Sequence, residues 1–271
     1  MDVGFIQGQQ GALFQVVHRP PTGIAVRGTV LYAHPLMEEH NKSRRMVALQ
    51  ARQLAAQGWV VVQPDLYGCG DSDGDFEEAR WEVWLEDLHA CLTKLPHDSQ
   101  QPLVLWGLRA GCLLIGDLIS RYSYTPALTI FWQPVVQGHV HLNQILRLRV
   151  ASGMMSGAAG ETTKILRERL QNGETVEVAG YDLHPEWVAA LSASTLQPPS
   201  TGEVVWLEVS GNSEASLSPV ASQKTQAWTD TGLAVHAQAL LGEPFWATQE
   251  ICEVPDLIQA TNRRLQQVGT S

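Results

Sequence analysis

A strand-to-helix turn, Gly107-Leu108-Arg109-Ala110-Gly111, is the segment of this 271-residue sequence best placed to do chemistry. It joins a predicted strand, residues 103–106, to a predicted helix, residues 112–119. Small residues on both sides of position 109 permit the tight turn of a nucleophile elbow, where residue 109 projects into a pocket. Backbone N–H groups of the following helix then point the same way. Two glycines at such a turn can also serve close packing alone, so the pattern leaves both interpretations open.

An elbow of this kind supports acyl transfer when it carries a nucleophile, when a base removes that group's proton, and when a third group orients the base. Arg109 cannot attack, because a guanidinium has no usable lone pair and stays protonated at physiological pH. Cys112 lies inside the predicted helix and is interpreted as a buried small hydrophobe. Ser72 lies in a turn, where serine is ordinary. No histidine follows His236, which we place on a strand face, so the base is missing too.

The elements that must position this turn alternate between short apolar runs and amphipathic stretches, which is typical of a mostly parallel sheet with helices on both faces. The predicted strands are residues 29–34, 59–62, 103–106, 128–132, 204–209 and 233–239. The predicted helices cover residues 43–57, about 81–92 and 112–119, with others beginning near 219 and after 255. Asp75 and Glu78 have the spacing of a capping box for the helix that follows them. Ligands of such a sheet bind at the carboxyl ends of its strands, where the elbow lies.

The stretch from about residue 133 to 200 breaks the alternation. It holds predicted helical pieces at 143–150, 161–170 and 185–191. We therefore predict a core of residues 1–134 and 201–271, and an inserted cap or lid of residues 135–200 above the carboxyl edge of the sheet.

Three further segments resemble parts of the α/β-hydrolase fold, and the resemblance extends over nearly the whole chain. His34-Pro35-Leu36 occupies the place of the fold's oxyanion loop, and residues 65–72 match its D-x-x-G-x-G-x-S turn. Gly211-Asn212-Ser213-Glu214 matches the loop that usually carries the acid of the triad. The resemblance implies an α/β-hydrolase fold, with a central mostly parallel sheet, helices on both faces and an inserted helical cap. It places Glu214 at the acid position.

A closer resemblance rests on residues 38–46 (EEHNKSRRM), 106–109 (WGLR), 132–136 (WQPVV) and 244–246 (PFW). These segments are similar to the exosortase A system-associated hydrolase 2 family, whose genes lie beside bacterial exopolysaccharide and PEP-CTERM sorting genes. The resemblance implies a hydrolase label and an acyl or ester substrate connected with extracellular polysaccharide.

Arg109 needs a counter-charge, because a cation at a helix N-terminus opposes the helix dipole and burial adds to the cost. Glu38 and Glu39 directly follow the oxyanion-type loop, and we predict a bidentate pair between Arg109 and one of them. One interpretation is a structural plug in a dead site. The other is an anion site, in which Arg109 acts with the N–H groups of Leu36 and Ala110.

Aromatic residues cluster at the predicted strand ends, and they either pack the cap on the core or form the floor of a sugar or acyl site. We assign no catalytic residue. The ligand-binding candidates are His34, Leu36, Glu38, Glu39, Arg109, Ala110, Trp132, Phe245 and Trp246.

Composition and charge disfavour several classes of binding partner. The net charge is −10 and no basic stripe is present, which disfavours nucleic acid and anionic membrane surfaces. We find no secretory signal and no span-length apolar run, so no membrane insertion is expected. The four cysteines are widely spaced, which indicates reduced thiols in a cytoplasmic protein and no metal site; no cofactor is expected.

The residues therefore favour a pseudoenzyme that binds a small anionic, acyl or glycan-derived ligand. One alternative is hydrolysis of an ester or acyl substrate by water, with Glu39 or Glu214 activating the water and Arg109 stabilising the oxyanion. Another is a non-catalytic partner of polysaccharide or protein export. A homodimer is one assembly that the sequence leaves open.

Overall fold

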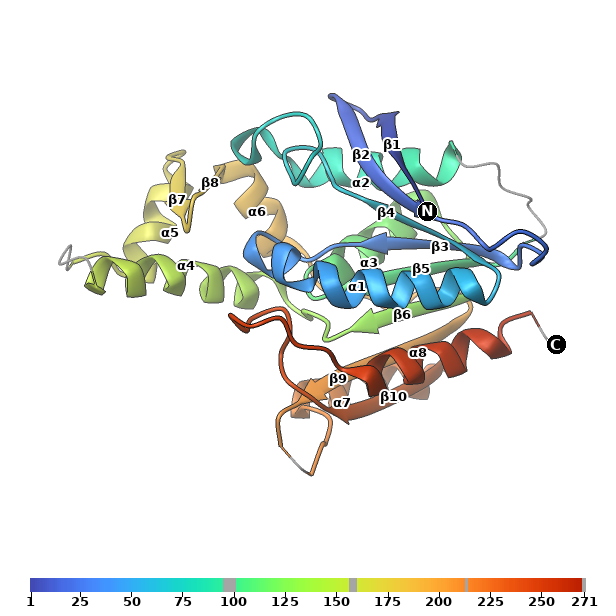
Figure 1. Ribbon diagram of the computed structural model, residues 1–271. Coiled ribbons are helices and arrows are strands. Elements are labelled where there is room, and N and C mark those ends of the chain that lie inside the picture. The colour runs from blue at the N-terminus through green and yellow to red at the C-terminus, as the bar shows by residue number, and fades with distance from the viewer. Residues whose placement is uncertain (95–100, 156–159, 213, 270–271) are drawn as a thin grey trace.

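The computed structural model describes residues 1–94, 101–155, 160–212 and 214–269, and an eight-stranded sheet runs through it (Figure 1). The strand order is β1-β2-β4-β3-β5-β6-β9-β10. From β4 to β10 all neighbours are parallel, whereas β2 pairs antiparallel with both β1 and β4. The strands are β1 (Asp2–Gln7), β2 (Ala12–His18), β3 (Gly28–Ala33), β4 (Trp59–Pro64), β5 (Leu103–Leu108), β6 (Leu128–Trp132), β9 (Glu203–Ser210) and β10 (Ala234–Leu241).

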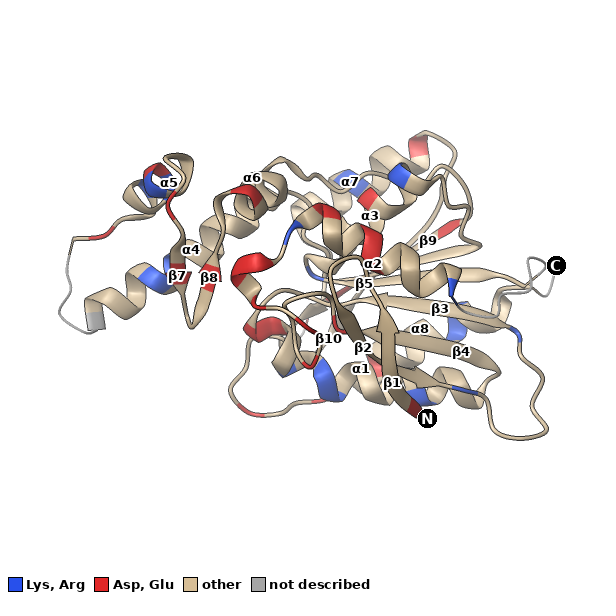
Figure 2. Cartoon of the chain, turned by 90° about the horizontal axis from the view of Figure 1, so that it is seen from above, with Lys and Arg blue, Asp and Glu red and all other residues tan. Residues whose placement is uncertain are grey.

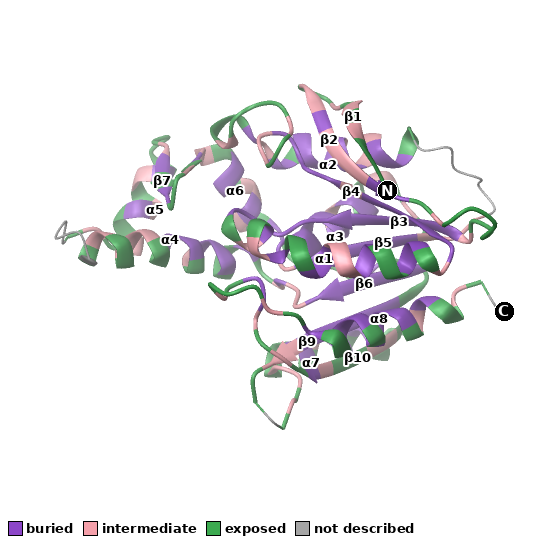
Figure 3. Cartoon of the chain, viewed as in Figure 1, coloured by how far each residue is buried: buried purple, intermediate pink, exposed green. Residues whose placement is uncertain are grey.

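Every strand predicted from an apolar run is present, with bounds shifted by a residue or two. The central strands are apolar throughout because both of their faces are covered: all six residues of β3 are buried. Figure 3 shows the same burial along β3, β5 and β6. The antiparallel pair β1–β2 was not predicted, since most of β1 is exposed and carries no continuous apolar run.

Helices cover both faces of the sheet. Helices α1 (Glu38–Ala56) and α8 (Pro255–Gln267) pack on one face, around the buried residues Met46, Leu54 and Leu257. Helices α2 (Trp81–Thr93), α3 (Gly111–Tyr122) and α7 (Pro219–Asp230) pack on the other. The predicted two-layered covering of a mostly parallel sheet is confirmed.

Two local predictions were wrong in position. Helix α1 begins at Glu38 instead of residue 43, because two acidic residues in its first turn suit the positive end of the helix dipole. The Asp75–Glu78 capping box does form. However, it caps the N-terminus of the short 3-10 helix η1 (Phe76–Glu78), whereas α2 begins only at Trp81.

A group of cap elements lies beyond the carboxyl ends of the parallel strands (Figure 1). It consists of α4 (Gly138–Met155), α5 (Thr163–Gln171), α6 (Pro185–Ala193) and the hairpin β7 (Val176–Val178) and β8 (Tyr181–Leu183). The three helices were predicted, the hairpin was not. Trp187 joins the cap to the core, since its ring lies 5.7 Å from that of Trp84 and 5.2 Å from that of Phe76. The division into a core of residues 1–134 and 201–271 and an inserted cap or lid of residues 135–200 stays a prediction.

Candidate functional site

The turn between β5 and α3 has the backbone of an elbow. Arg109 adopts a left-handed φ of 54°, which is strained for a residue with a side chain. Its N–H donates to the carbonyl of Trp132 at 3.0 Å, and its own carbonyl accepts from Val135 at 3.2 Å. Gly111 makes the close approach possible, because a Cβ there would lie 2.2 Å from the Ala33 carbonyl oxygen. The geometry fits both open interpretations of the glycines, the elbow and close packing.

The guanidinium of Arg109 forms a two-pronged ion pair with Glu39 in the first turn of α1. Nε donates to the two carboxylate oxygens at 3.1 and 3.3 Å, and Nη2 donates to Oε1 at 3.0 Å. The two side chains are only 15% and 22% exposed, and the Trp246 ring lies over the guanidinium, with its centroid 5.5 Å from Cζ. The predicted pair is confirmed for Glu39. Glu38 instead accepts a hydrogen bond from the Tyr181 hydroxyl of the cap at 3.0 Å.

Three residues whose chemical type would suit a nucleophile or a base have structural roles instead. Cys112 is fully buried, and burial raises the pKa of its thiol well above the ordinary value. The Ser72 hydroxyl donates to the Asp65 carbonyl at 2.6 Å within the turn. His236 lies on the edge strand β10 and pairs with Glu203 at 3.3 Å. Within the described ranges, no serine or cysteine hydrogen-bonds to an imidazole, so no nucleophile–base pair is assembled there.

A family model described as serine aminopeptidase, S33, matches residues 25–196, which is more than half of the chain. The chain belongs to this family. The name refers to a serine, whereas this S33 member presents Arg109 at its elbow. A comparison with curated proteins found no match.

Solved structures support the same fold. Est1E from Butyrivibrio proteoclasticus with bound ferulic acid is 18% identical, with a TM-score of 0.70, and the alignment covers 99% of this chain and 100% of that one. XC6422 from Xanthomonas campestris, an α/β serine hydrolase without a lid, is 17% identical with a TM-score of 0.58, covering 100% and 96%. Proline iminopeptidase from Mycobacterium smegmatis is 14% identical with a TM-score of 0.58, covering 98% of both. The predicted α/β-hydrolase fold of this S33 member is confirmed.

The oxyanion-type loop is anchored by a buried imidazole. His34 donates from Nδ1 to the Pro35 carbonyl at 2.7 Å and accepts at Nε2 from the Leu66 N–H at 3.3 Å, which fixes its tautomer. Burial, with a smaller effect from His40, lowers the pKa of His34 to about 3. His34 is only 1% exposed and both of its ring nitrogens are occupied. In this structure it holds the loop in place with both nitrogens engaged, and its role as a ligand-binding residue stays a prediction that this geometry does not favour.

Beside it lies a histidine–carboxylate pair that the sequence did not reveal. His40 Nε2 and Asp65 Oδ1 are 3.0 Å apart, and Arg44 and the Asp71 N–H also donate to Asp65. Burial alone would raise the pKa of Asp65, but the hydrogen bond and charge of His40 outweigh it, so the pKa lies well below its ordinary range. The pair resembles a base with its orienting acid. It lacks a nucleophile, since no described hydroxyl or thiol bonds to His40.

A cap residue, His141 of α4, is the second group that sequence reasoning missed. Burial lowers its pKa, the charge of Glu39 raises it, and that of Arg109 lowers it, so the imidazole lies within electrostatic reach of the ion pair. Its Nδ1 is 3.3 Å from the Gln144 side-chain oxygen. Only the packing of the cap on the core brings it within reach of these charges, and no local spacing predicts that arrangement.

The aromatic residues at the strand ends divide into two groups. Trp132 is fully buried against Trp106, with ring centroids 4.6 Å apart, and its indole N–H donates to Thr261 at 2.9 Å. Phe245 packs on the same ring and is 2% exposed. The core between the sheet and α8 encloses both rings, and their role as ligand-binding residues stays a prediction that this burial does not favour. Trp246 is the aromatic that reaches Arg109.

The remaining candidates are placed as follows. Glu214 is exposed in its loop, where its N–H donates to the Asn212 side chain at 3.2 Å; Ser213 lies outside the described residues. The side chains of Leu36 and Ala110 are buried, and their N–H groups form no hydrogen bond within the described segments. At 2% and 0% exposure both residues are enclosed by the protein, so these two donors have no partner among the described residues but do not face solvent.

Over the described ranges, no group of three or more His, Cys, Asp or Glu side chains has the arrangement of a metal site. None of the described helices combines the length and apolarity that a membrane span requires. Figure 2 shows lysines and arginines scattered over the core and cap instead of gathered in a stripe.

Proposed function

We propose that this S33 member binds a small anionic ligand, acyl or glycan-derived, at Arg109, and performs no acyl transfer through a covalent intermediate. The observation that carries the proposal is the guanidinium held at the elbow by Glu39. The pair engages Nε and Nη2, whereas Nη1 has no partner within the described part of the chain. A carboxylate or phosphate can accept hydrogen bonds from Nη1 without displacing Glu39.

The surroundings favour an anion at this place. The N-terminus of α3 carries partial positive charge, and the buried N–H groups of Leu36 and Ala110 have no hydrogen-bond partner among the described residues. Glu39 offsets part of this charge, so we expect modest affinity and a ligand that gains the rest of its binding energy from its uncharged part.

The similarity to the exosortase-associated family supports a ligand derived from extracellular polysaccharide or its acyl groups. With it come two further proposals: that the protein is cytoplasmic, where such a ligand would be a biosynthetic intermediate, and that it pairs as a homodimer.

Thermal-shift and calorimetric titrations with acetate, butyrate, inorganic phosphate and glucuronate test the binding. We expect at least one of these anions to raise the melting temperature of the wild type, and the gain to disappear in Arg109→Gln. The matched control is Arg147→Gln, on an exposed part of α4, which should keep the gain. A flat response of the wild type to all four anions would contradict the proposal.

Water-based hydrolysis is the second candidate, favoured by the contact of a carboxylate with a guanidinium at the elbow. It is weaker, because both oxygens of Glu39 already accept from Arg109. Turnover of short p-nitrophenyl esters that is lost in both Glu39→Gln and Arg109→Ala would replace the binding proposal with this one.

A further inference from the structure

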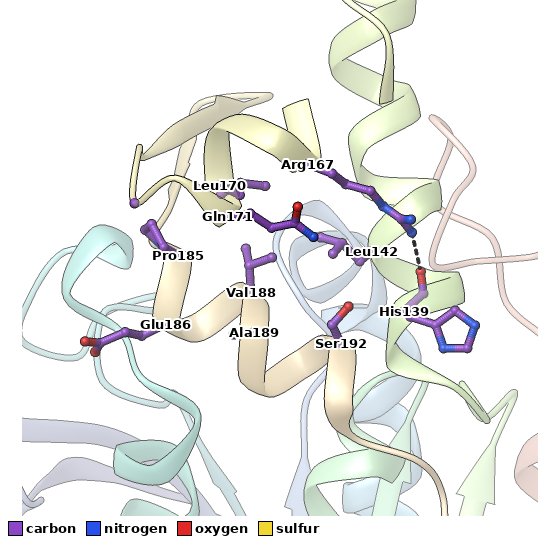
Figure 4. A pocket seen from close by; sticks show the side chains of 11 residues that line it. His139, Leu142, Arg167, Leu170, Gln171, Pro185, Glu186, Val188, Ala189 and Ser192 are labelled. Atoms are coloured by element: carbon purple, nitrogen blue, oxygen red, sulfur yellow. Dashed lines mark hydrogen bonds between the residues drawn. The ribbon is translucent and has the colours of Figure 1, made fainter. Parts of the chain in front are cut away.

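The cap contains a pocket of its own, with a volume of about 550 Å³, between helices α4, α5 and α6 (Figure 4). This volume lies within the range of small-molecule sites in proteins. The lining residues are His139, Leu142, Arg167, Leu170, Gln171, Gly173, Pro185, Glu186, Val188, Ala189 and Ser192.

The inner wall of the pocket is apolar. Leu142, Leu170 and Val188 are 2%, 4% and 6% exposed, and each comes from a different helix. The side chains of Gln171 and Ser192 point into the space between the helices (Figure 4). The pocket thus offers an apolar body site with a few polar groups, which is the usual composition of a ligand site.

The pocket is bordered by a positive charge, Arg167, that has no carboxylate partner among the described residues. Two other cap arginines each meet two glutamates: Arg149 pairs with Glu161 and Glu177, and Arg169 with Glu161 and Glu174. Arg167 meets no carboxylate within the described residues, and its Nη2 contacts only the His139 backbone carbonyl at 3.5 Å.

The one acidic residue in the lining does not neutralise Arg167. Glu186 pairs with Arg80 of the core at 3.0 Å, and its carboxylate points away from the pocket in Figure 4. The half-exposed guanidinium of Arg167 therefore borders an apolar cavity with no carboxylate of the described residues beside it.

We propose that this pocket binds a carboxylate with an apolar body, such as a medium-chain fatty acid. The carboxylate pairs with Arg167, Gln171 and Ser192 add hydrogen bonds, and the chain lies on Leu142 and Val188. The site is separate from the elbow. Neither Arg109 nor Glu39 is among the residues that line the pocket.

Calorimetric titration of the full chain with decanoate tests the proposal, with decanol as the uncharged control ligand. Arg167→Gln should weaken decanoate binding at least tenfold, because a charged hydrogen bond is lost, and should leave decanol binding unchanged. Ala189→Trp, which fills the pocket from the exposed side of α6, should abolish binding of both ligands. Arg147→Gln is the matched control and should bind decanoate like the wild type.

The elbow is the competing place for a carboxylate, and one more variant separates the two sites. Arg109→Gln should retain the component of decanoate binding that depends on Arg167. If Arg109→Gln abolishes binding while Arg167→Gln and Ala189→Trp do not, decanoate occupies the elbow and the cap site is wrong. Absence of saturable decanoate binding by the wild type would also overturn it, and would leave the binding of smaller anions at Arg109 untouched.

Discussion

Arg109 combines a strained backbone with a charged side chain in a mostly buried setting. Its left-handed φ costs about 1 kcal/mol or more, and hydrogen bonds at both its N–H and its carbonyl hold it in place. The charge is tolerated because Glu39 supplies a bidentate partner and Trp246 covers the guanidinium. A residue that cannot attack a carbonyl is thus held firmly at the turn between β5 and α3.

Removing the carboxylate of Glu39 should show how far the stability of the fold depends on the Arg109–Glu39 pair. Glu39→Gln leaves the guanidinium largely buried without its carboxylate, and we expect the free energy of unfolding to fall by about 1–3 kcal/mol, because the pair is partly exposed. Urea unfolding measures the change. The neighbouring Glu38→Gln is the control, since Glu38 contacts a tyrosine hydroxyl and no arginine, and it should change stability far less. Equal losses in the two variants would mean that the ion pair has no special role.

At the scale of elements, the site depends on how closely α3 approaches the sheet. A Cβ at Gly111 would lie 2.2 Å from the backbone oxygen of Ala33, so the start of α3 can adopt its position only with glycine there. This contact sets the elbow against β3 and, through the loop after β3, against the first turn of α1, where Glu39 lies.

Gly111→Ala should therefore destabilise the protein by about 3 kcal/mol, because the clash is with backbone that cannot rotate away. Gly116→Ala, one turn further along α3, is the matched control: its added Cβ would lie 3.5 Å from Leu196, an ordinary contact. Alanine favours a helix more than glycine does, so this variant should be neutral or stabilised. Thermal unfolding of both variants checks the pair, and a stable Gly111→Ala protein would show that the close approach is not required.

The same elements show what the sequence could and could not predict. Strands buried on both faces are continuous apolar runs, so β3, β5 and β6 were recognised, and the turn after β5 followed from its glycines. The Arg109–Glu39 pair was predictable because a buried cation needs a nearby carboxylate. The influence of the Arg109–Glu39 charges on His141 and the enclosure of Trp132 arise from packing between distant segments, which no local spacing encodes.

At the scale of the whole molecule, several buried histidines are kept neutral. Burial lowers the pKa values of His18, His34, His40 and His141, whereas burial raises the pKa of Asp87 to about 6 and also raises that of Asp117. As the pH falls below 6.5, these histidines bind protons in the unfolded chain but not in the folded protein. The free energy of unfolding therefore falls. The two carboxyl groups act in the opposite direction between pH 6 and 4, but they are fewer.

We therefore expect the melting temperature to fall by several degrees between pH 7.5 and pH 5, with the histidine contribution fully present above pH 6.5. Calorimetric scans across this range measure it. His141→Gln should reduce the dependence, because it removes one of the buried imidazoles. A melting temperature that stays constant or rises on acidification would contradict this account of the buried histidines.

The most direct test of the missing-triad account is reaction of the wild-type protein with a fluorophosphonate probe, alongside an active serine hydrolase of the same fold. The account predicts no covalent labelling under conditions that label the active enzyme completely, and none in Arg109→Ser, which gains a hydroxyl at a position where no described imidazole forms a hydrogen bond. Robust labelling of the wild type, traced by mass spectrometry to any serine or cysteine under the cap, would contradict it.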